Sequence, residues 1–394
     1  MEREAAACTT PKEYAVATGL WRPSTRQEGI CVKDHLLRSR LALAATGLLA
    51  LLVLMALGVA TALATDGGPA QPPNSPNQAG AYDGPSVRAT PPPSRWVAVS
   101  VATLWVKPRL ARAVDAPACA NPADPRAWVK SMTLKQKRWL DGRLETQALY
   151  GTRVYLLGTS GSWSKVAVSG QPTPRNAWGY PGWLPTSQLT ATAPPTGNAV
   201  AVVRRPTAWL WTAADLQVRA LELSYDTRLP AASWTSTAVE VVLLNGRHLY
   251  LRRAVVALHA AGAAWPKPTG ARLVKDARRF LGLRYLWAGT SGFGLDCSGF
   301  THSIFHAFGI TIPRDAAPQA ARGRKISTRS ALRPGDLVFF RNAAGVIHHV
   351  GMYVGAGKMI HSPATGRPVV LSSLYAAPYF SEFAGGRRYV RYRR

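Results

Sequence analysis

The sequence predicts an α+β protein, and three patterns support this fold class. The residues after Cys297 carry apolar side chains at helical spacing as far as Gly309, a typical helix end. Residues 336–340 and 346–354 alternate as two strands joined by a short turn. Between residues 95 and 189, short Val- and Trp-rich runs alternate with glycine turns, which is typical of a small β-barrel.

Cys297 is the first candidate for chemistry because it stands where the predicted helix begins. Unpaired backbone N–H groups and the positive end of the helix dipole stabilise a thiolate there. Such sites lower a thiol pKa from ~8.5 into the range ~3.5–7.5. We therefore expect Cys297 to be a nucleophile near neutral pH; the alternative is a buried cysteine that only packs.

A nucleophilic thiol needs a partner that takes and returns a proton, and histidine suits this exchange. His348 and His349 are neighbours in the second strand of the hairpin, so their side chains point to opposite faces and only one can address the thiol. Alternation leaves open which one. His361 follows a glycine turn and could orient the imidazole from a neighbouring strand. Each histidine, taken singly, could also be an ordinary surface or core residue.

Five short motifs resemble those of the NlpC-type cell-wall cysteine peptidases. The resemblance covers about residues 268–394 and implies a papain-like catalytic domain. Enzymes of this kind hydrolyse the peptide stems of bacterial peptidoglycan, commonly between D-glutamate and a diamino acid. The motifs are Tyr285-Leu286-Trp287-Ala288-Gly289, Asp296-Cys297-Ser298-Gly299-Phe300, Arg333-Pro334-Gly335-Asp336-Leu337, His349-Val350-Gly351-Met352-Tyr353 and Ile360-His361-Ser362.

The resemblance implies catalytic roles for three positions. Cys297 would attack the scissile carbonyl, His349 would act as general base, and His361 would hold the base, which resolves the ambiguity at His348. Backbone N–H groups at the start of the helix would stabilise the oxyanion. We expect no metal or other cofactor, because the sequence has neither a CxxC pair nor an HExxH helix.

The resemblance also implies substrate-binding residues around the nucleophile. Tyr285, Asp296 and Ser298 are expected there, and Asp296 matches an acidic residue that in relatives helps to bind a free amino end. Tyr285 could instead be a packed aromatic and Asp296 a helix cap, although one carboxylate can do both. Relatives often carry a second glycine at Ala288 and a small hydroxyl residue at Asp315, so these departures concern pocket shape rather than the reacting groups.

Two β-rich regions precede the catalytic part. Residues 95–190 resemble the bacterial SH3-like domain of some NlpC-type enzymes, with residues 114–143 as an insertion, and residues 198–262 predict a second SH3-like barrel. In multi-barrel relatives the first barrel holds a free N-terminal L-alanine, and we nominate Glu145 and Tyr180 for this role. Ordinary surface charge and barrel core are their alternatives. Such a barrel would favour peptides freed from glycan, whereas a plain wall-binding barrel would favour intact peptidoglycan.

Residues 41–64 form an apolar run without charge that is long enough, as a helix, to cross ~30 Å of hydrocarbon. Basic residues precede the run, so the positive-inside rule keeps residues 1–40 in the cytoplasm and places the catalytic part outside the cytoplasmic membrane. Residues 65–94 are rich in Pro, Gly and Asn and predict an exposed linker. The alternative is a signal peptide that is cleaved, which would release the protein.

The formal net charge of +28 predicts attraction to anionic wall polymers or lipid headgroups. Nucleic acid is not an expected partner, because charge alone is not specific and the basic part is expected outside the cell. Residues 387–394 interleave Arg with Tyr as nucleic-acid binders do, but they also fit an edge strand protected by charge. Only Cys119 and Cys297 follow the apolar run, so we expect Cys119 to be free in a loop.

The sequence thus predicts a membrane-tethered cysteine peptidase that cleaves γ-D-glutamyl–diamino-acid bonds in wall peptides. One alternative is a peptidoglycan-binding scaffold whose terminal domain is inactive. Another is a thiol amidase or acyltransferase acting on a different wall amide, because a thioester intermediate does not fix the acceptor.

Overall fold

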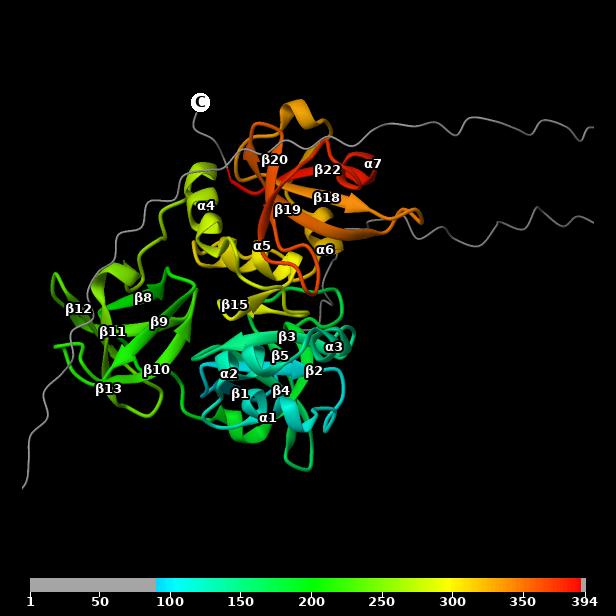
Figure 1. Cartoon of the computed structure of the whole chain (residues 1–394). Coiled ribbons are helices and arrows are strands. Elements are labelled where there is room, and N and C mark those ends of the chain that lie inside the picture. The colour runs from blue at the N-terminus through cyan, green and yellow to red at the C-terminus, as the bar shows by residue number, and fades with distance from the viewer. Residues whose placement is uncertain (1–89, 391–394) are drawn as a thin grey trace, which may run out of the picture. The chain divides into compact units, whose positions relative to one another are not determined.

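The computed structural model describes residues 90–390 (Figure 1). The predicted cytoplasmic segment 1–40, the predicted membrane segment 41–64 and most of the predicted linker 65–94 lie outside the described residues. Within the part that is described, no helix is both long enough and apolar enough to cross a membrane.

The first sheet has seven antiparallel strands in the order β3-β2-β6-β5-β4-β1-β7 and occupies the region where the first barrel is predicted. Its core is formed by alternate residues of these strands, among them Val97, Leu104, Val154 and Val166, because successive strand residues face opposite sides. The strands are β1 (Ser94–Val97), β2 (Val101–Trp105), β3 (Leu144–Leu149), β4 (Arg153–Ser160), β5 (Trp163–Val168), β6 (Tyr180–Pro185) and β7 (Leu189–Thr190), with a 3-10 turn η2 (Thr186–Gln188).

A helical insertion separates β2 from β3. Its centre is the buried carboxylate of Asp115, which accepts hydrogen bonds from Trp128 Nε1 (2.9 Å) and Arg112 Nε (2.8 Å). Burial alone would raise the pKa of Asp115, but these donors lower it below its usual value. The insertion comprises η1 (Ala113–Asp115), α1 (Ala116–Cys119), α2 (Pro125–Ser131) and α3 (Leu134–Trp139).

Cys119 is the last residue of α1 and is free. The prediction of a free thiol is confirmed, but the prediction that it lies in a loop was wrong. Pro117 near the start of α1 favours a helical turn at this point, and the backbone N–H of Ala120 closes it on Ala116.

The second sheet also has seven antiparallel strands, in the order β10-β9-β13-β12-β11-β8-β14. It contacts the first sheet and its insertion through Tyr150, whose hydroxyl accepts the backbone N–H of Leu244 (2.9 Å), and through an ion pair between Arg126 and Glu222 (2.6 Å). Its strands are β8 (Ala199–Val203), β9 (Thr207–Trp211), β10 (Arg219–Ser224), β11 (Arg228–Trp234), β12 (Ala238–Val242), β13 (His248–Arg252) and β14 (Val256–Ala260), with η3 (Arg253–Val255).

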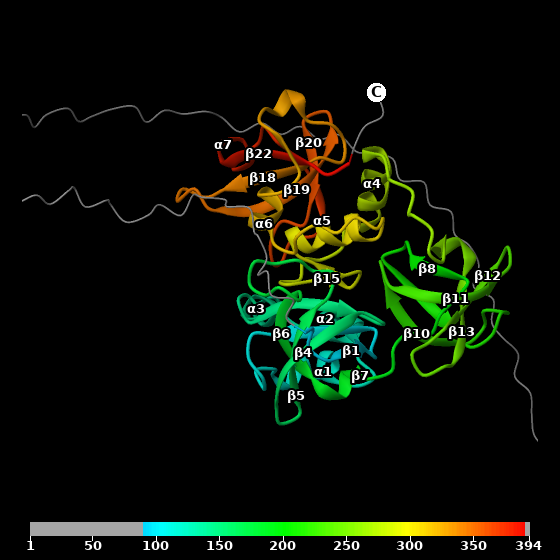
Figure 2. The ribbon, with the colours of Figure 1, turned by 180° about the vertical axis from the view of Figure 1, so that it is seen from behind.

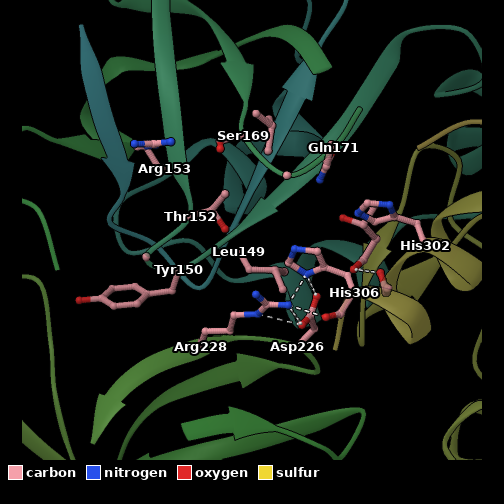
Figure 3. Close-up of a pocket in the computed structure, with 15 residues that line it drawn as sticks. Leu149, Tyr150, Thr152, Arg153, Ser169, Gln171, Asp226, Arg228, His302 and His306 are labelled. Atoms are coloured by element: carbon pink, nitrogen blue, oxygen red, sulfur yellow. Dashed lines mark hydrogen bonds and ion pairs between the residues drawn. The ribbon is translucent and has the colours of Figure 1, made fainter. Parts of the chain in front are cut away.

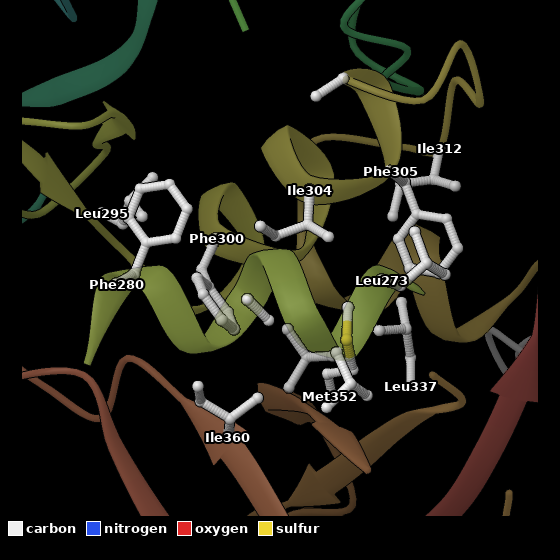
Figure 4. Close-up of a cluster of buried hydrophobic side chains, with 14 of the residues drawn as sticks. Leu273, Phe280, Leu295, Phe300, Ile304, Phe305, Ile312, Leu337, Met352 and Ile360 are labelled. Carbon is white, nitrogen blue, oxygen red and sulfur yellow. The ribbon is translucent and has the colours of Figure 1, made fainter. Parts of the chain in front are cut away.

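The third sheet has six strands in the order β17-β22-β18-β19-β20-β21, and helices pack against it. Figure 4 shows the core between them, where Phe300, Ile304 and Phe305 of one helix meet Leu337 and Met352 of the sheet. The strands are β17 (Arg324–Ile326), β18 (Leu337–Arg341), β19 (Ile347–Gly355), β20 (Lys358–His361), β21 (Val370–Ser373) and β22 (Phe383–Arg388). The helices are α4 (Gly270–Ala277), η4 (Arg278–Phe280), α5 (Cys297–His306), α6 (Ala316–Ala320), η5 (Arg329–Ala331) and α7 (Tyr379–Glu382).

Strand β22 lies between β17 and β18, so Arg387 and Arg388 belong to an interior strand, and for these two residues the predicted edge strand was wrong. Residues 391–394 of the predicted tail lie outside the described residues. Its arginines are accommodated because Arg388 pairs with the buried carboxylate of Asp336 (2.6 Å). The predicted hairpin is confirmed as β18 and β19, with Phe340 opposite His349.

Helix α5 lies between the third sheet and the first sheet in both views (Figure 2). The short ribbon β15 (Thr290–Ser291) and β16 (Gly294–Leu295) connects it to the first sheet, because Thr290 Oγ1 donates to the carbonyl of Gln147 (3.0 Å). A Cβ at Gly299 would lie 2.1 Å from the carbonyl oxygen of Gly289, so only glycine lets the first turn of α5 approach this backbone. The start of α5 is thereby fixed.

Candidate active site

Cys297 is the first residue of α5, as predicted, and Asp296 caps the helix by accepting the N–H of Gly299 (2.6 Å). Burial, and next the charge of Asp296, raise the pKa of the Cys297 thiol to about 12, against the effect of hydrogen bonds from the backbone N–H groups of Val350 and Ser298. The expected low pKa is therefore not found, because loss of solvation outweighs the helix terminus. The resting thiol is neutral and needs a base.

Two histidines lie next to each other on adjacent strands. Nε2 of His349 on β19 is 2.7 Å from Nδ1 of His361 on β20, and Nε2 of His361 is 2.9 Å from Oγ of Ser372 on β21. Burial, and next the neighbouring His361, lower the pKa of His349 to about 3; burial and then Arg367 lower the pKa of His361 to about 4. Both imidazoles are therefore neutral near pH 7.

The hydrogen-bond order fixes one useful tautomer. If His361 donates from Nε2 to Ser372, its Nδ1 accepts from His349 Nε2–H, and Nδ1 of His349 then carries a lone pair. His348 is exposed and its Nε2 lies 3.1 Å from the carboxylate of Glu382, whereas His349 is buried. Strand alternation and the neighbouring strands thus distinguish the two histidines.

A pocket of about 370 Å³ contains both the thiol and His349. It combines aromatic and proline side chains with two carboxylates, a composition that suits a peptide with charged groups. Its lining is Asp141, Tyr285, Trp287, Cys297, His348, His349, Pro363, Ala364, Thr365, Pro378, Tyr379 and Glu382.

Tyr285 is buried in the wall of this pocket, and burial followed by the charges of Cys297 and Asp296 raises the pKa of its phenol. Three residues further on, Ala288 has φ +59°. This left-handed conformation favours glycine, so alanine strains the turn.

Asp296 and Ser298 take part in a buried polar cluster. Arg314 donates to Asp296 Oδ2 (2.6 Å) and Oδ1 (3.1 Å) and to Ser298 Oγ (3.1 Å), and its side chain is almost fully buried. Both carboxylate oxygens of Asp296 are therefore occupied, as a structural cap and ion-pair partner. The roles of Asp296 and Ser298 in substrate binding stay predictions.

Glu145 on β3 and Tyr180 on β6 of the first sheet share a partner, Arg175, and Tyr180 reaches the third-sheet region. The hydroxyl of Tyr180 donates to Asp315 Oδ1 (3.2 Å), and Arg175 binds Glu145 through two hydrogen bonds (2.5 and 2.8 Å) while donating to the Tyr180 oxygen (3.2 Å). Glu145 is thus an ion-pair partner rather than a solvated lone acid. Burial, and next the charge of Asp315, raise the pKa of Tyr180.

Several residues of the candidate site and its surroundings could not be predicted from the sequence. Ser372 stands in a short strand without a strong pattern, and Arg175 stands in a loop, so neither carries a local signal. Arg314 is adjacent to Asp315 in a motif, but an arginine there reads as exposed until the fold buries it. Among residues 90–390, no three His, Cys, Asp or Glu side chains converge on a metal site.

A second pocket, of about 240 Å³, lies near the other end of α5 (Figure 3). His306 of α5 reaches Asp226, with 2.5 Å between Nδ1 and Oδ2, and Arg228 donates to the His306 carbonyl. His302 stacks on His306 at 5.5 Å between ring centroids. This cluster joins the second sheet to the helix that carries Cys297.

Comparison with known proteins gives matches over both halves of the described region. Residues 282–388 match the model of the NlpC/P60 family, and residues 203–258 match that of the YKFC SH3b2 domain. The chain is 45% identical over 302 residues to γ-D-glutamyl-L-lysine dipeptidyl-peptidase of Bacillus cereus, covering 75% of this chain and 90% of the relative. It is 36% identical to the Bacillus subtilis protein of the same name, covering 73% and 96%.

A solved structure is similar over the same region. The crystal structure of an NlpC/P60 family protein from Bacillus cereus superimposes with a TM-score of 0.71 at 43% sequence identity. The match covers 76% of this chain and all of the solved one. The three sheets therefore share their fold with that protein.

Proposed function

Because the chain belongs to the NlpC/P60 family, we propose that it is a cysteine peptidase that hydrolyses the bond between γ-D-glutamate and a diamino acid in peptidoglycan stem peptides. The observation that carries this proposal is one pocket holding the thiol of Cys297 and His349, with His361 bonded to the far nitrogen of His349. Two relatives named γ-D-glutamyl-L-lysine dipeptidyl-peptidase support the choice of bond.

The chemistry starts from a neutral pair. As Sγ of Cys297 attacks the scissile carbonyl carbon, Nδ1 of His349 takes the thiol proton. The imidazolium of His349 therefore forms at the same time as the bond between Sγ and the carbonyl carbon. Backbone N–H groups at the start of α5 stabilise the oxyanion. Collapse of the tetrahedral intermediate breaks the C–N bond and leaves a thioester on Cys297, and His349 gives its proton to the leaving amine. His349 then takes a proton from the water that hydrolyses the thioester, and the thiol is restored.

Glu145, Tyr180 and Asp315 form the site we propose for the free amino end of the substrate. Tyr180 contacts Asp315 directly and is connected to Glu145 through Arg175, so two carboxylates and a hydroxyl could accept the three donors of an ammonium group. Holding the amino end at one place would limit how many residues can lie between it and Cys297, as the removal of dipeptides named for two relatives requires. Arg175 must release Glu145 before the amino group can bind.

The test uses purified full-length protein and mass spectrometry of L-Ala-γ-D-Glu-L-Lys, with a free or an acetylated amino end. We expect release of lysine from the free peptide and at least about 10-fold slower release from the acetylated one. Cys297→Ala should abolish release, whereas Cys119→Ala, which removes the other described cysteine, should not. Cleavage of another amide bond, or unchanged turnover by Cys297→Ala, would contradict the proposal.

We also propose that residues 90–390 act outside the cytoplasmic membrane. The support is the apolar run at residues 41–64 and the basic residues before it. Protease added to intact cells should digest the described part of the chain only after wall removal. Full protection in intact spheroplasts would contradict this location.

A further inference from the structure

We propose that Asp141 binds the side-chain ammonium group of the diamino acid that leaves the enzyme, and this inference rests on the proposed function. Asp141 follows α3 in the helical insertion of the first sheet, and its backbone N–H closes that helix on Arg138 (3.1 Å). It lines the pocket that holds Cys297 and His349. The insertion thereby contributes a carboxylate to a site that is otherwise built by the third-sheet region.

Asp141 has spare binding capacity. Among the described residues its carboxylate receives one hydrogen bond, from Thr365 Oγ1 to Oδ1 (3.1 Å), which orients it and leaves Oδ2 open. The other acid of the pocket, Glu382, already lies 3.1 Å from His348 Nε2. Asp141 is therefore the carboxylate in this pocket that a new cation can reach without displacing a partner.

The geometry of the reaction puts the leaving residue on this side. His349 gives a proton to the leaving amine, so the residue that carries this amine lies in the pocket lined by His349. Glu145, Tyr180 and Asp315 do not line this pocket. The amino end of the substrate and the leaving residue thus have separate binding groups.

The walls between the thiol and Asp141 suit an aliphatic chain. Trp287, Pro363 and Ala364 offer apolar surface, and Trp287 is fixed because its Nε1 donates to the carbonyl of Leu144 (3.2 Å). A lysine-like side chain can lie along them and place its ammonium group at the carboxylate. Asp141 is exposed, so a ligand can reach its carboxylate. Desolvation raises its pKa, against the effects of Thr365 and Arg138, and a cation beside the carboxylate opposes this shift.

The experiment compares L-Ala-γ-D-Glu-L-Lys with the same peptide ending in L-norleucine, which has the same chain length but no ammonium group. We expect full-length wild-type protein to prefer the lysine peptide in kcat/KM by about 10- to 100-fold, as for a charge-assisted hydrogen bond. Asp141→Asn should reduce this preference to within about 3-fold, mainly through a higher KM for the lysine peptide. Glu382→Gln, which changes the other acid of the pocket, should retain the preference.

A binding measurement tests this inference independently of the proposed peptidase activity. Calorimetry with Cys297→Ala and with the Cys297→Ala, Asp141→Asn double variant measures the Kd ratio of the two peptides without turnover. Loss of the lysine preference in the double variant supports the inference even if no peptide is cleaved. The inference would be overturned if both variants preferred the lysine peptide over the norleucine peptide to the same degree. It would also be overturned if Asp141→Asn affected only peptides with a free amino end and not acetylated ones. Equal melting temperatures of the two variants confirm that both are folded.

Discussion

Nε2 of His349 lies 2.7 Å from Nδ1 of His361, so the base is held by a second imidazole rather than by a carboxylate. An imidazole can donate or accept at this nitrogen, and only the accepting form leaves His349 with a lone pair on Nδ1. The next residue in the chain of hydrogen bonds is Ser372, whose Oγ lies 2.9 Å from His361 Nε2. When this hydroxyl accepts from His361 Nε2–H, Nδ1 of His361 is the accepting nitrogen. We therefore expect the competence of the base to depend on this hydroxyl, which is two hydrogen bonds away from His349.

Replacing Ser372 by Ala should lower kcat by about 10-fold and leave KM within about 2-fold, because removing a partner of an orienting group disturbs the base but not substrate contacts. Ser372→Thr keeps the hydroxyl and should restore kcat. Steady-state kinetics on the lysine peptide checks both, with Ser373→Ala as the control on the adjacent residue. An unchanged kcat in Ser372→Ala would show that His361 keeps its tautomer unaided.

Arg175 should compete with the substrate for Glu145. In Arg175→Gln the carboxylate loses its cation, and we expect KM for peptides with a free amino end to fall by about 3- to 10-fold, because no ion pair must open first. Acetylated peptides should show no such gain. Because the Arg175 side chain is 45% exposed, added salt should weaken the pair and shrink the difference between variant and wild type. A higher KM in the variant would mean that Arg175 binds the substrate itself.

Local sequence pattern predicted where the candidate reacting groups stand but not what surrounds them. Helix periodicity placed Cys297 at the start of α5, whereas only the resemblance to NlpC-type peptidases favoured His349 over His348. The ion pair of Asp296 with Arg314 depends on a buried arginine that only the tertiary fold positions. The direction of the Cys297 pKa failed for the same reason, because burial is a property of the whole fold and a helix start is a local one.

Stability should fall as the pH drops below about 6.5, and His302 should account for part of the loss. Burial, followed by the neighbouring His306, lowers the pKa of His302 to about 3. Between these pH values the unfolded chain binds a proton that the folded chain does not, so acidification lowers the free energy of unfolding.

His302→Asn keeps a donor for the carbonyl of Ile312 but does not titrate. Urea unfolding at pH 7 and pH 4 should show a loss about 2 kcal/mol smaller in the variant. Equal losses would contradict this assignment.

The pair of Asp226 and His306 should stabilise the attachment of the second sheet to helix α5 (Figure 3). Burial alone would raise the pKa of Asp226, but His306 and then Arg228 lower it below its usual value. A lowered carboxyl pKa contributes stability at pH values above the unfolded pKa of about 3.9, and this contribution is lost as the pH falls through the folded pKa.

Asp226 has φ +68°, a conformation that asparagine tolerates, so Asp226→Asn removes the charge without straining the backbone. Urea unfolding should show the variant less stable by about 2 kcal/mol at pH 7, and the difference should shrink as the pH falls below about 3.9 and the wild-type carboxylate takes up a proton. Asp215→Asn, an exposed change in the same sheet region, should have little effect, and a pH-independent difference for Asp226→Asn would point to packing rather than charge.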